Sequence, residues 1–192
     1  MTKIQYLLVF DIEKTITGKG YKMSALIIDG KKISEEVKTD VAQRVKALNE
    51  KGIEPCLAVI LVGDNPASVS YVTGKRKALA AVGMKDRSLL LAADTKQEDL
   101  LKVIDDLNKD KSVHGILVQL PLPKTFDEEK VTNAILPEKD VDGFHPVNAG
   151  NLLIGGRGFL PCTPHGICVM LKKMGVKTDG AHAVIVGRSN IV

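Results

Sequence analysis

The chain has 192 residues, 44% of them hydrophobic and 26% charged, a balance typical of a folded globular protein that excludes a mainly disordered chain. Its 27 lysines and arginines exceed its 23 aspartates and glutamates by four, and they form no basic stripe with interleaved aromatic residues, so we expect no nucleic-acid partner. The apolar runs are much shorter than the roughly 20 residues of a membrane-spanning helix, so we expect no membrane partner.

From Met23 onward the chain alternates between two kinds of apolar pattern. Continuous apolar runs predict strands over residues 25–28, 56–62, 88–92, 115–118 and 183–186. Segments with apolar residues every three or four positions predict helices capped by Ser34, Asn65, Thr95 and Thr163, and a shorter helix over residues 127–135. This alternation predicts an α/β fold in which helices cover both faces of a parallel sheet.

Residues 136–160 form a long stretch rich in glycine, proline, aspartate and asparagine, with little apolar periodicity. Loops of that length inside compact domains are usually functional or connect two domains. We therefore expect one of these two roles for this stretch.

The three cysteines, Cys56, Cys162 and Cys168, are an odd number in a chain of ordinary size, which favours reduced thiols in a reducing compartment. Residues 1–22 contain neither the apolar core of a secretion signal nor the arginines of a transit peptide. We therefore expect a cytoplasmic protein, in which residues 1–22 are an extension of unknown role.

Tyr71 and Lys75 are the first candidates for chemistry, because their spacing of four puts both side chains on one helix face, one turn apart. A lysine becomes an effective acid or base near neutral pH when burial or a neighbouring cation lowers its pKa, and a phenol one turn away can hydrogen-bond to it. The alternative is a solvated face formed by residues 75–77. A short-chain dehydrogenase is excluded, because no glycine-rich nucleotide turn follows the first predicted strand.

Two further polar residues lie where such sheets place their ligand contacts. Gln119 follows the apolar strand over residues 115–118, and Pro121 ends the strand pairing soon afterwards. Asp142 lies in a later loop, where a fixed carboxylate can accept two hydrogen bonds from the edge of an aminopyrimidine ring. Each has a structural alternative, with Gln119 satisfying loop backbone and Asp142 capping a turn.

Cys162, His165 and Cys168 follow one another at spacings of three and suggest zinc ligands. These side chains share a helix face only if the helix already includes Cys162, whereas Pro164 predicts that it begins afterwards. We therefore expect no metal site, and we expect Cys168 to be a small buried side chain.

Five segments together resemble, in order and at similar separations, the bifunctional methylenetetrahydrofolate dehydrogenase/cyclohydrolase family. They are Tyr71-Val-Thr-Gly-Lys-Arg-Lys77, Gly115-Ile-Leu-Val-Gln-Leu-Pro-Leu-Pro123, Pro137-Glu-Lys-Asp-Val-Asp-Gly143, Pro161-Cys-Thr-Pro164 and Val186-Gly-Arg-Ser-Asn-Ile-Val192. The resemblance implies a three-layer α-β-α folate-binding catalytic domain over residues 23–145. It also implies that residues 146–192 form a crossover and the beginning of a Rossmann-type NADP-binding domain.

The resemblance implies two reactions of one-carbon folate metabolism, namely NADP-dependent oxidation of 5,10-methylenetetrahydrofolate to 5,10-methenyltetrahydrofolate and hydrolysis of that product to 10-formyltetrahydrofolate. Lys75 would be the central acid/base of the hydrolysis, Gln119 would contact its amine, and Asp142 would hold the pterin amino edge. The implied catalytic residues are Lys75, Tyr71 and Gln119. The implied folate-binding residues are Tyr71, Lys75, Gln119, Leu120, Pro121 and Asp142.

The implied cofactor residues are Thr163, Gly187, Arg188 and Ser189. Gly187 would allow close approach of the backbone to phosphate, and Arg188 would pair with a 2′-phosphate, which favours NADP over NAD. The resemblance also implies a homodimer for the full-length family, through contacts that lie largely in the cofactor domain.

The sequence stops at Val192, inside the last motif, so we expect a C-terminally truncated member of the family. One strand and half a turn do not hold a dinucleotide, and dehydrogenase activity is therefore not expected of the chain as given. The alternative is a short folate-binding domain or pseudoenzyme that lacks dehydrogenase activity.

Overall fold

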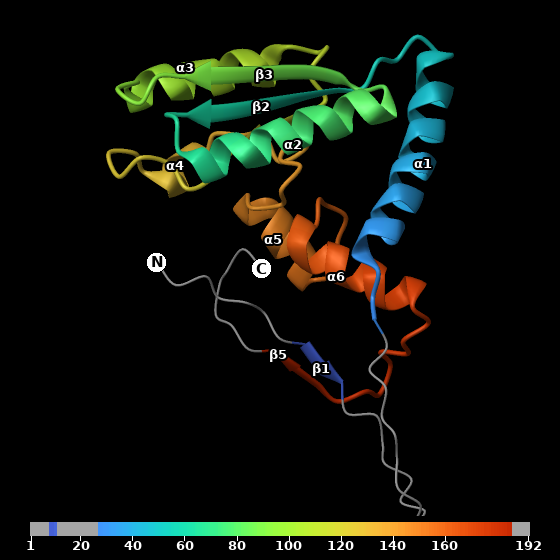
Figure 1. Ribbon diagram of the computed structural model, residues 1–192. Coiled ribbons are helices and arrows are strands. Elements are labelled where there is room, and N and C mark those ends of the chain that lie inside the picture. The colour runs from blue at the N-terminus through green and yellow to red at the C-terminus, as the bar shows by residue number, and fades with distance from the viewer. Residues whose placement is uncertain (1–7, 11–26, 186–192) are drawn as a thin grey trace, which may run out of the picture.

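The computed structural model describes residues 8–10 and 27–185, and Figure 1 shows how their elements are arranged. The helices are α1 (Gly30–Asn49), α2 (Pro66–Val82), α3 (Gln97–Lys109), α4 (Glu128–Asn133), α5 (Pro146–Leu153) and α6 (Cys162–Lys173). The strands are β1 (Leu8–Phe10), β2 (Cys56–Val62), β3 (Lys85–Leu91), β4 (Gly115–Val118) and β5 (Ala183–Ile185). None of the helices in these ranges is long and apolar enough to cross a membrane.

Three parallel strands form the central sheet, in the order β3–β2–β4. β2 lies in the middle, where its continuous apolar sequence is buried from both sides, and Val59 lies beside Ser88 of β3 and Leu117 of β4. A further bridge joins Ile116 of β4 to Asp140. The segment around Asp140 is therefore attached to the β4 edge of the sheet.

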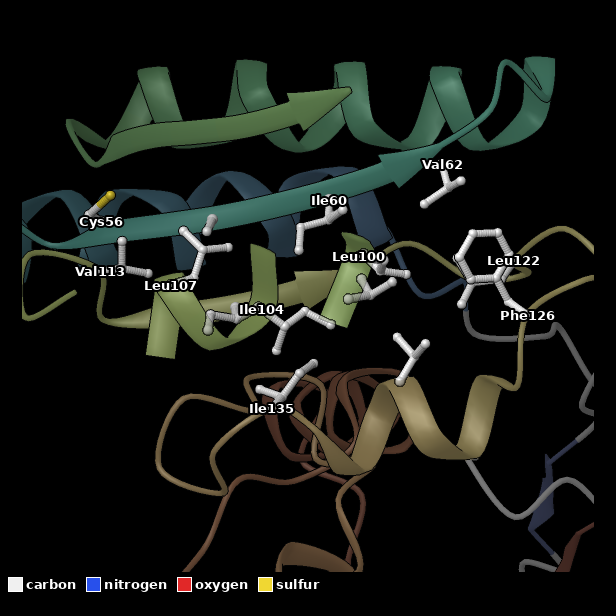
Figure 2. Close-up of a cluster of buried hydrophobic side chains, with 14 residues drawn as sticks. Cys56, Ile60, Val62, Leu100, Ile104, Leu107, Val113, Leu122, Phe126 and Ile135 are labelled. Atoms are coloured by element: carbon white, nitrogen blue, oxygen red, sulfur yellow. The ribbon is translucent and has the colours of Figure 1, made fainter. Parts of the chain in front are cut away.

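The side chains of β2 alternate between two apolar layers. Ile60 packs with Leu100 and Ile104 of α3 in the large buried cluster drawn in Figure 2. Val59 points to the opposite face and packs with Val72 of α2. The two helices therefore cover opposite faces of the sheet, which confirms the predicted three-layer α-β-α arrangement.

α1 begins at Gly30, so the prediction that Ser34 caps it is wrong. Asp29 is the cap instead, because its side chain accepts a hydrogen bond from the backbone N of Lys32 at 3.0 Å. Ile27 and Ile28, predicted to end a strand, are exposed and have no regular structure, while the rest of that predicted strand lies outside the described residues.

Two other predicted caps are also wrong. α3 begins at Gln97, so Thr95 does not cap it, and α6 begins at Cys162, so Thr163 lies within its first turn. In both helices the residue before the first turn makes no side-chain cap hydrogen bond and has an extended ψ, 151° at Lys96 and 128° at Pro161. The chain enters these helices from extended backbone rather than through a polar cap.

β3 begins at Lys85, three residues before the predicted strand, because it pairs with all seven residues of β2. An edge strand tolerates charged side chains, so the first residues of β3 do not form the apolar run by which the strand was predicted.

Residues 136–160 are not one long loop, because α5 lies within them. β5 pairs antiparallel with β1, with Val184 beside Val9.

Candidate active site

The carboxyl ends of β2 and β4 lie side by side where the direction of chain winding reverses. β2 leads to α2 on one face of the sheet, whereas β4 lies on the other side of β2 from β3 and follows α3 on the opposite face. Open α/β sheets bind ligands in the crevice at such a point. Gln119 directly follows β4 here, and its backbone N donates a hydrogen bond to the carbonyl O of Ile60 at 2.8 Å.

Lys75 reaches this point from α2. Its Nζ donates a hydrogen bond to Oε1 of Gln119 at 3.2 Å, and Nε2 of Gln119 donates to the carbonyl O of Leu120 at 2.7 Å. Both side chains are half-buried. The glutamine amide is thus fixed by its two partners, with its oxygen turned toward the lysine.

Tyr71 lies one helical turn before Lys75 and is 67% exposed. Among the hydrogen bonds of the described residues, its phenol makes none to Lys75, so the ring is open to contact with a flat ligand. Leu120 is half-buried and Pro121 is exposed, directly after Gln119. These residues place apolar surface beside the Lys75–Gln119 pair.

Asp142 lies in the loop between α4 and α5. Burial raises the pKa of its carboxyl above the ordinary value, and the positive charge of Lys75 and a side-chain hydrogen bond with Cys162 partly offset this effect. The structure therefore brings Asp142 close enough to Lys75 for their charges to interact. A half-buried carboxylate near a lysine and an amide suits recognition of a polar ring that donates hydrogen bonds.

Two residues near Asp142 were missed by the sequence analysis as parts of the site. The Sγ of Cys162 lies 3.6 Å from the carbonyl O of Val141, and burial together with the neighbouring Asp142 raises the pKa of the Cys162 thiol. Lys139 anchors the same loop, since its Nζ donates to the carbonyl O atoms of residues 107, 108 and 110 at 2.8–2.9 Å. Both residues belong to motifs that were recognised, but Cys162 was considered only as a zinc ligand and Lys139 was given no role.

The predicted cofactor residues are described only in part. Thr163 is exposed in the first turn of α6, whereas Gly187, Arg188 and Ser189 lie outside the described residues.

The helix that carries the possible zinc ligands begins earlier than expected. α6 begins at Cys162, so Cys162, His165 and Cys168 do follow one another along one helix. Even so, the part of the chain that the structure describes holds no group of three His, Cys, Asp or Glu side chains arranged to bind a metal ion. Cys168 is exposed, so the expectation that it is buried is wrong.

Comparison with known proteins gives matches along most of the chain. Residues 28–142 match the family described as "Tetrahydrofolate dehydrogenase/cyclohydrolase, catalytic domain", and residues 161–192 match its "NAD(P)-binding domain". The chain is 54% identical over 168 residues to "Bifunctional protein FolD" of Oceanobacillus iheyensis, and 56% identical over 170 residues to the protein of that name from Moorella thermoacetica. These alignments cover 88% of this chain and 59% and 61% of the relatives, so the chain spans about 60% of their length.

Solved structures give the same picture. The bifunctional enzyme FolD of Campylobacter jejuni superimposes with a TM-score of 0.76 at 49% identity, over 78% of this chain and 53% of that one. The Trypanosoma brucei enzyme, solved with NADP cofactor and an inhibitor, gives a TM-score of 0.76 at 36% identity, over 79% of this chain and 52% of that one. The resemblance carried by the five sequence motifs is confirmed, and the chain belongs to the tetrahydrofolate dehydrogenase/cyclohydrolase family.

Proposed function

We propose that this protein hydrolyses 5,10-methenyltetrahydrofolate to 10-formyltetrahydrofolate and that, with a complete NADP-binding domain, it also oxidises 5,10-methylenetetrahydrofolate to 5,10-methenyltetrahydrofolate with NADP. The observation that carries the proposal is the hydrogen bond from Lys75 Nζ to Gln119 Oε1 at 3.2 Å, with Asp142 near enough to interact with the lysine charge. The family of the chain and the names of its relatives support the same two reactions.

The proposed division of the chain follows the same reasoning. Residues 23–145 form the folate-binding catalytic domain, and residues 146–192 form a crossover and the beginning of the NADP-binding domain. The two family matches, over residues 28–142 and 161–192, support this division. Residues 1–22 are an extension without an assigned role.

In the hydrolysis, water adds to the carbon that lies between N5 and N10 of the folate. We assign the proton transfers to Lys75, because a lysine amine can take a proton from the attacking water and deliver one to N5 as the carbon–N5 bond breaks. The second water proton leaves to solvent, and the formyl group remains on N10. Gln119 holds the lysine amine at the reacting carbon, which keeps donor and acceptor aligned for the transfer.

Folate recognition is assigned to the other residues around the pair. The carboxylate of Asp142 accepts hydrogen bonds from the amino edge of the pterin, the most polar part of the ligand. The exposed ring of Tyr71 packs against the flat part of the folate, and Leu120 and Pro121 line the same surface. Apolar contact and a fixed polar edge together orient the methenyl carbon toward Lys75.

NADP, when bound, accepts the hydride in the oxidation. Thr163 would hold it together with Gly187, Arg188 and Ser189. The exposed hydroxyl of Thr163, in the first turn of α6, suits a hydrogen bond to the cofactor. For the oxidation itself, the described residues contribute the orientation of the folate through Asp142 and Tyr71.

The test is to incubate the purified chain with 5,10-methenyltetrahydrofolate and to measure 10-formyltetrahydrofolate. We expect formation well above the uncatalysed rate. The same preparation is assayed with 5,10-methylenetetrahydrofolate and NADP, and production of NADPH is expected only from a protein with the complete NADP-binding domain. Folate binding without either reaction would instead support the alternative of a folate-binding pseudoenzyme. The cytoplasmic location and the homodimer of the full-length family stay predictions.

A further inference from the structure

Asp140 is a buried carboxylate that the proposed chemistry does not use. It is 2% exposed, and its Oδ2 accepts hydrogen bonds from the backbone N of His145 at 2.8 Å and from Nδ2 of Asn148 at 2.9 Å. No ion pair involves it among residues 27–185. Because burying a carboxylate without a cation is costly unless N–H donors compensate, these two contacts restrict Asp140 to one position.

Asn148 extends this contact to two other parts of the loop. Its Nδ2 also donates to the carbonyl O of Pro137 at 2.9 Å, and its Oδ1 accepts from the backbone N of Phe159 at 3.3 Å. The amide is 3% exposed and therefore has little freedom to turn. Asp140 and Asn148 therefore connect the segment around Pro137, which precedes Asp142, to the segment around Phe159, which leads into α6.

The turn that carries Asp142 starts at Asp140. The backbone N of Gly143 donates to the carbonyl O of Asp140 at 3.2 Å, and Gly143 has a φ of +69°, which favours glycine. A side chain at Gly143 would lie 2.9 Å from the backbone of residues 159–161, so the end of the turn is packed tightly. Asp142 therefore lies between two fixed points.

The start of the turn is also attached to the sheet. The backbone N of Ile116 in β4 donates to the carbonyl O of Lys139 at 2.8 Å, next to Asp140. Because Gln119 follows the same strand, this bond sets the position of the turn relative to the Lys75–Gln119 pair. The Asp140 carboxylate fixes the same end of the turn from the side of α5, through the backbone N of His145 and Nδ2 of Asn148.

We propose that Asp140 is a positioning residue for the folate site, whose buried carboxylate, held by His145 and Asn148, fixes the turn that presents Asp142 to the ligand. This inference rests on the proposed function, in which Asp142 binds the pterin. Asp140 does not touch the folate and acts through Asp142, so its loss weakens binding while Lys75 and Gln119 keep their places.

The kinetic test compares Asp140→Ala with Asp142→Ala and the double variant in the hydrolysis of 5,10-methenyltetrahydrofolate. We expect Asp140→Ala to raise KM by about tenfold with kcat within about twofold of the parent, and the double variant to have no higher KM than Asp142→Ala alone. Asp140→Asn keeps one oxygen that can accept both hydrogen bonds and should restore most of the KM. Asp127→Ala, which removes an exposed helix cap elsewhere, is the matched control and should leave KM unchanged.

Hydrogen exchange supplies a readout that does not depend on activity. In Asp140→Ala the amides of residues 141–145 should exchange at least about ten times faster, while those of β2 keep the parent rate. Unchanged exchange over residues 141–145, or KM effects of Asp140 and Asp142 that multiply in the double variant, would overturn the inference. If the parent protein does not hydrolyse the substrate, the proposed function fails, and the exchange pattern alone decides whether Asp140 holds the turn.

Discussion

Lys75 and Gln119 are 44 positions apart in the chain, yet the lysine ammonium donates a hydrogen bond to the glutamine side-chain oxygen across 3.2 Å. The next residue, Arg76, has a carboxylate partner instead, Asp86, at 2.7 Å. A neutral amide holds a lysine in place without the strong preference for the charged form that a carboxylate imposes. Gln119 therefore positions the lysine without adding a second negative charge to that of Asp142.

Lys75→Gln should lower the rate of hydrolysis of 5,10-methenyltetrahydrofolate by at least about 100-fold, because glutamine cannot exchange a proton with water or N5. Lys77→Gln, at an exposed position two residues further along the same helix, is the control and should keep the parent rate. In a protein with the complete NADP-binding domain, reduction of NADP should continue in Lys75→Gln. Hydrolysis at the parent rate in that variant would contradict the role assigned to Lys75.

Gln119→Glu replaces the neutral partner by a carboxylate of the same length. The carboxylate favours the ammonium form of Lys75, so we expect hydrolysis near pH 7 to fall by about tenfold or more and to recover partly as the pH rises. A pH–rate profile of kcat measures this, with Gln43→Glu on the exposed surface of α1 as the control. A profile that matches the parent would show that the amide of Gln119 does not act on Lys75.

Asp142→Asn should stabilise the fold near neutral pH while weakening folate binding. Burial is the largest cause that raises the pKa of Asp142 above 3.8, so the native state binds this proton more tightly than the unfolded state does. The ionised carboxylate therefore lowers the free energy of unfolding above the native pKa, and this cost disappears as the pH falls toward 3.8. Urea unfolding of Asp142→Asn and the parent at several pH values measures this difference in the free energy of unfolding. A variant that is less stable than the parent at pH 7 would contradict the expected stabilisation.

Gly115→Ala tests the contact between β4 and the loop that carries Asp142. An added Cβ would lie 2.5 Å from Cγ1 of Val141 and 3.2 Å from Cδ1 of Leu57, so we expect a loss of about 1 to 3 kcal/mol in the free energy of unfolding. Gly74→Ala is the opposite case, because an added Cβ there meets nothing within 4 Å and alanine favours the helix by about 0.5 to 1 kcal/mol. Denaturant unfolding of the two variants should shift in opposite directions.

Lys139→Met removes an ammonium that satisfies three carbonyl groups at the end of α3 and keeps most of the apolar length of the side chain. We expect the free energy of unfolding to fall by about 2 kcal/mol, since these half-buried carbonyls lose a charged donor. Lys109→Met, which breaks only an exposed pair with Asp105 in the same helix, should cost much less, because solvent screens this pair. Equal losses in the two variants would contradict the capping role of Lys139.

Patterns of neighbouring residues predicted the first and last residues of some helices and strands correctly. β2 and α2 have the predicted bounds, because an uninterrupted apolar run marks the strand, and Asn65 and Gly83 mark the ends of the helix. The side chain of Asn65 accepts from the backbone N of Ala67 at 3.0 Å, and Gly83 has a φ of +76°. The capping box predicted at Thr95 and Glu98 was wrong, because α3 begins after Lys96, which has extended backbone and makes no side-chain cap hydrogen bond.

The sequence motifs predicted which residues belong to the candidate site, but not the contacts between distant segments that hold them in place. Gln119 was expected at the end of its strand, and the expected contact with Lys75 is present at 3.2 Å. The bonds that fix Asp142 were not expected, because Lys139 reaches carbonyls about 30 residues earlier and Asn148 joins Pro137 to Phe159. Such contacts depend on how the loop folds back on the sheet, and no periodicity in the sequence records that path.

The order β3–β2–β4 has a consequence for folding as well as for chemistry. Parallel neighbours need a helical crossover between them, so the groups that meet at the carboxyl ends, Lys75, Gln119 and Asp142, come from three separate parts of the chain. Contacts of such high sequence separation form only when loop-closure entropy has been overcome, late and together. Hydrolysis should therefore appear during refolding in step with the native sheet, and its recovery would measure completion of the tertiary structure.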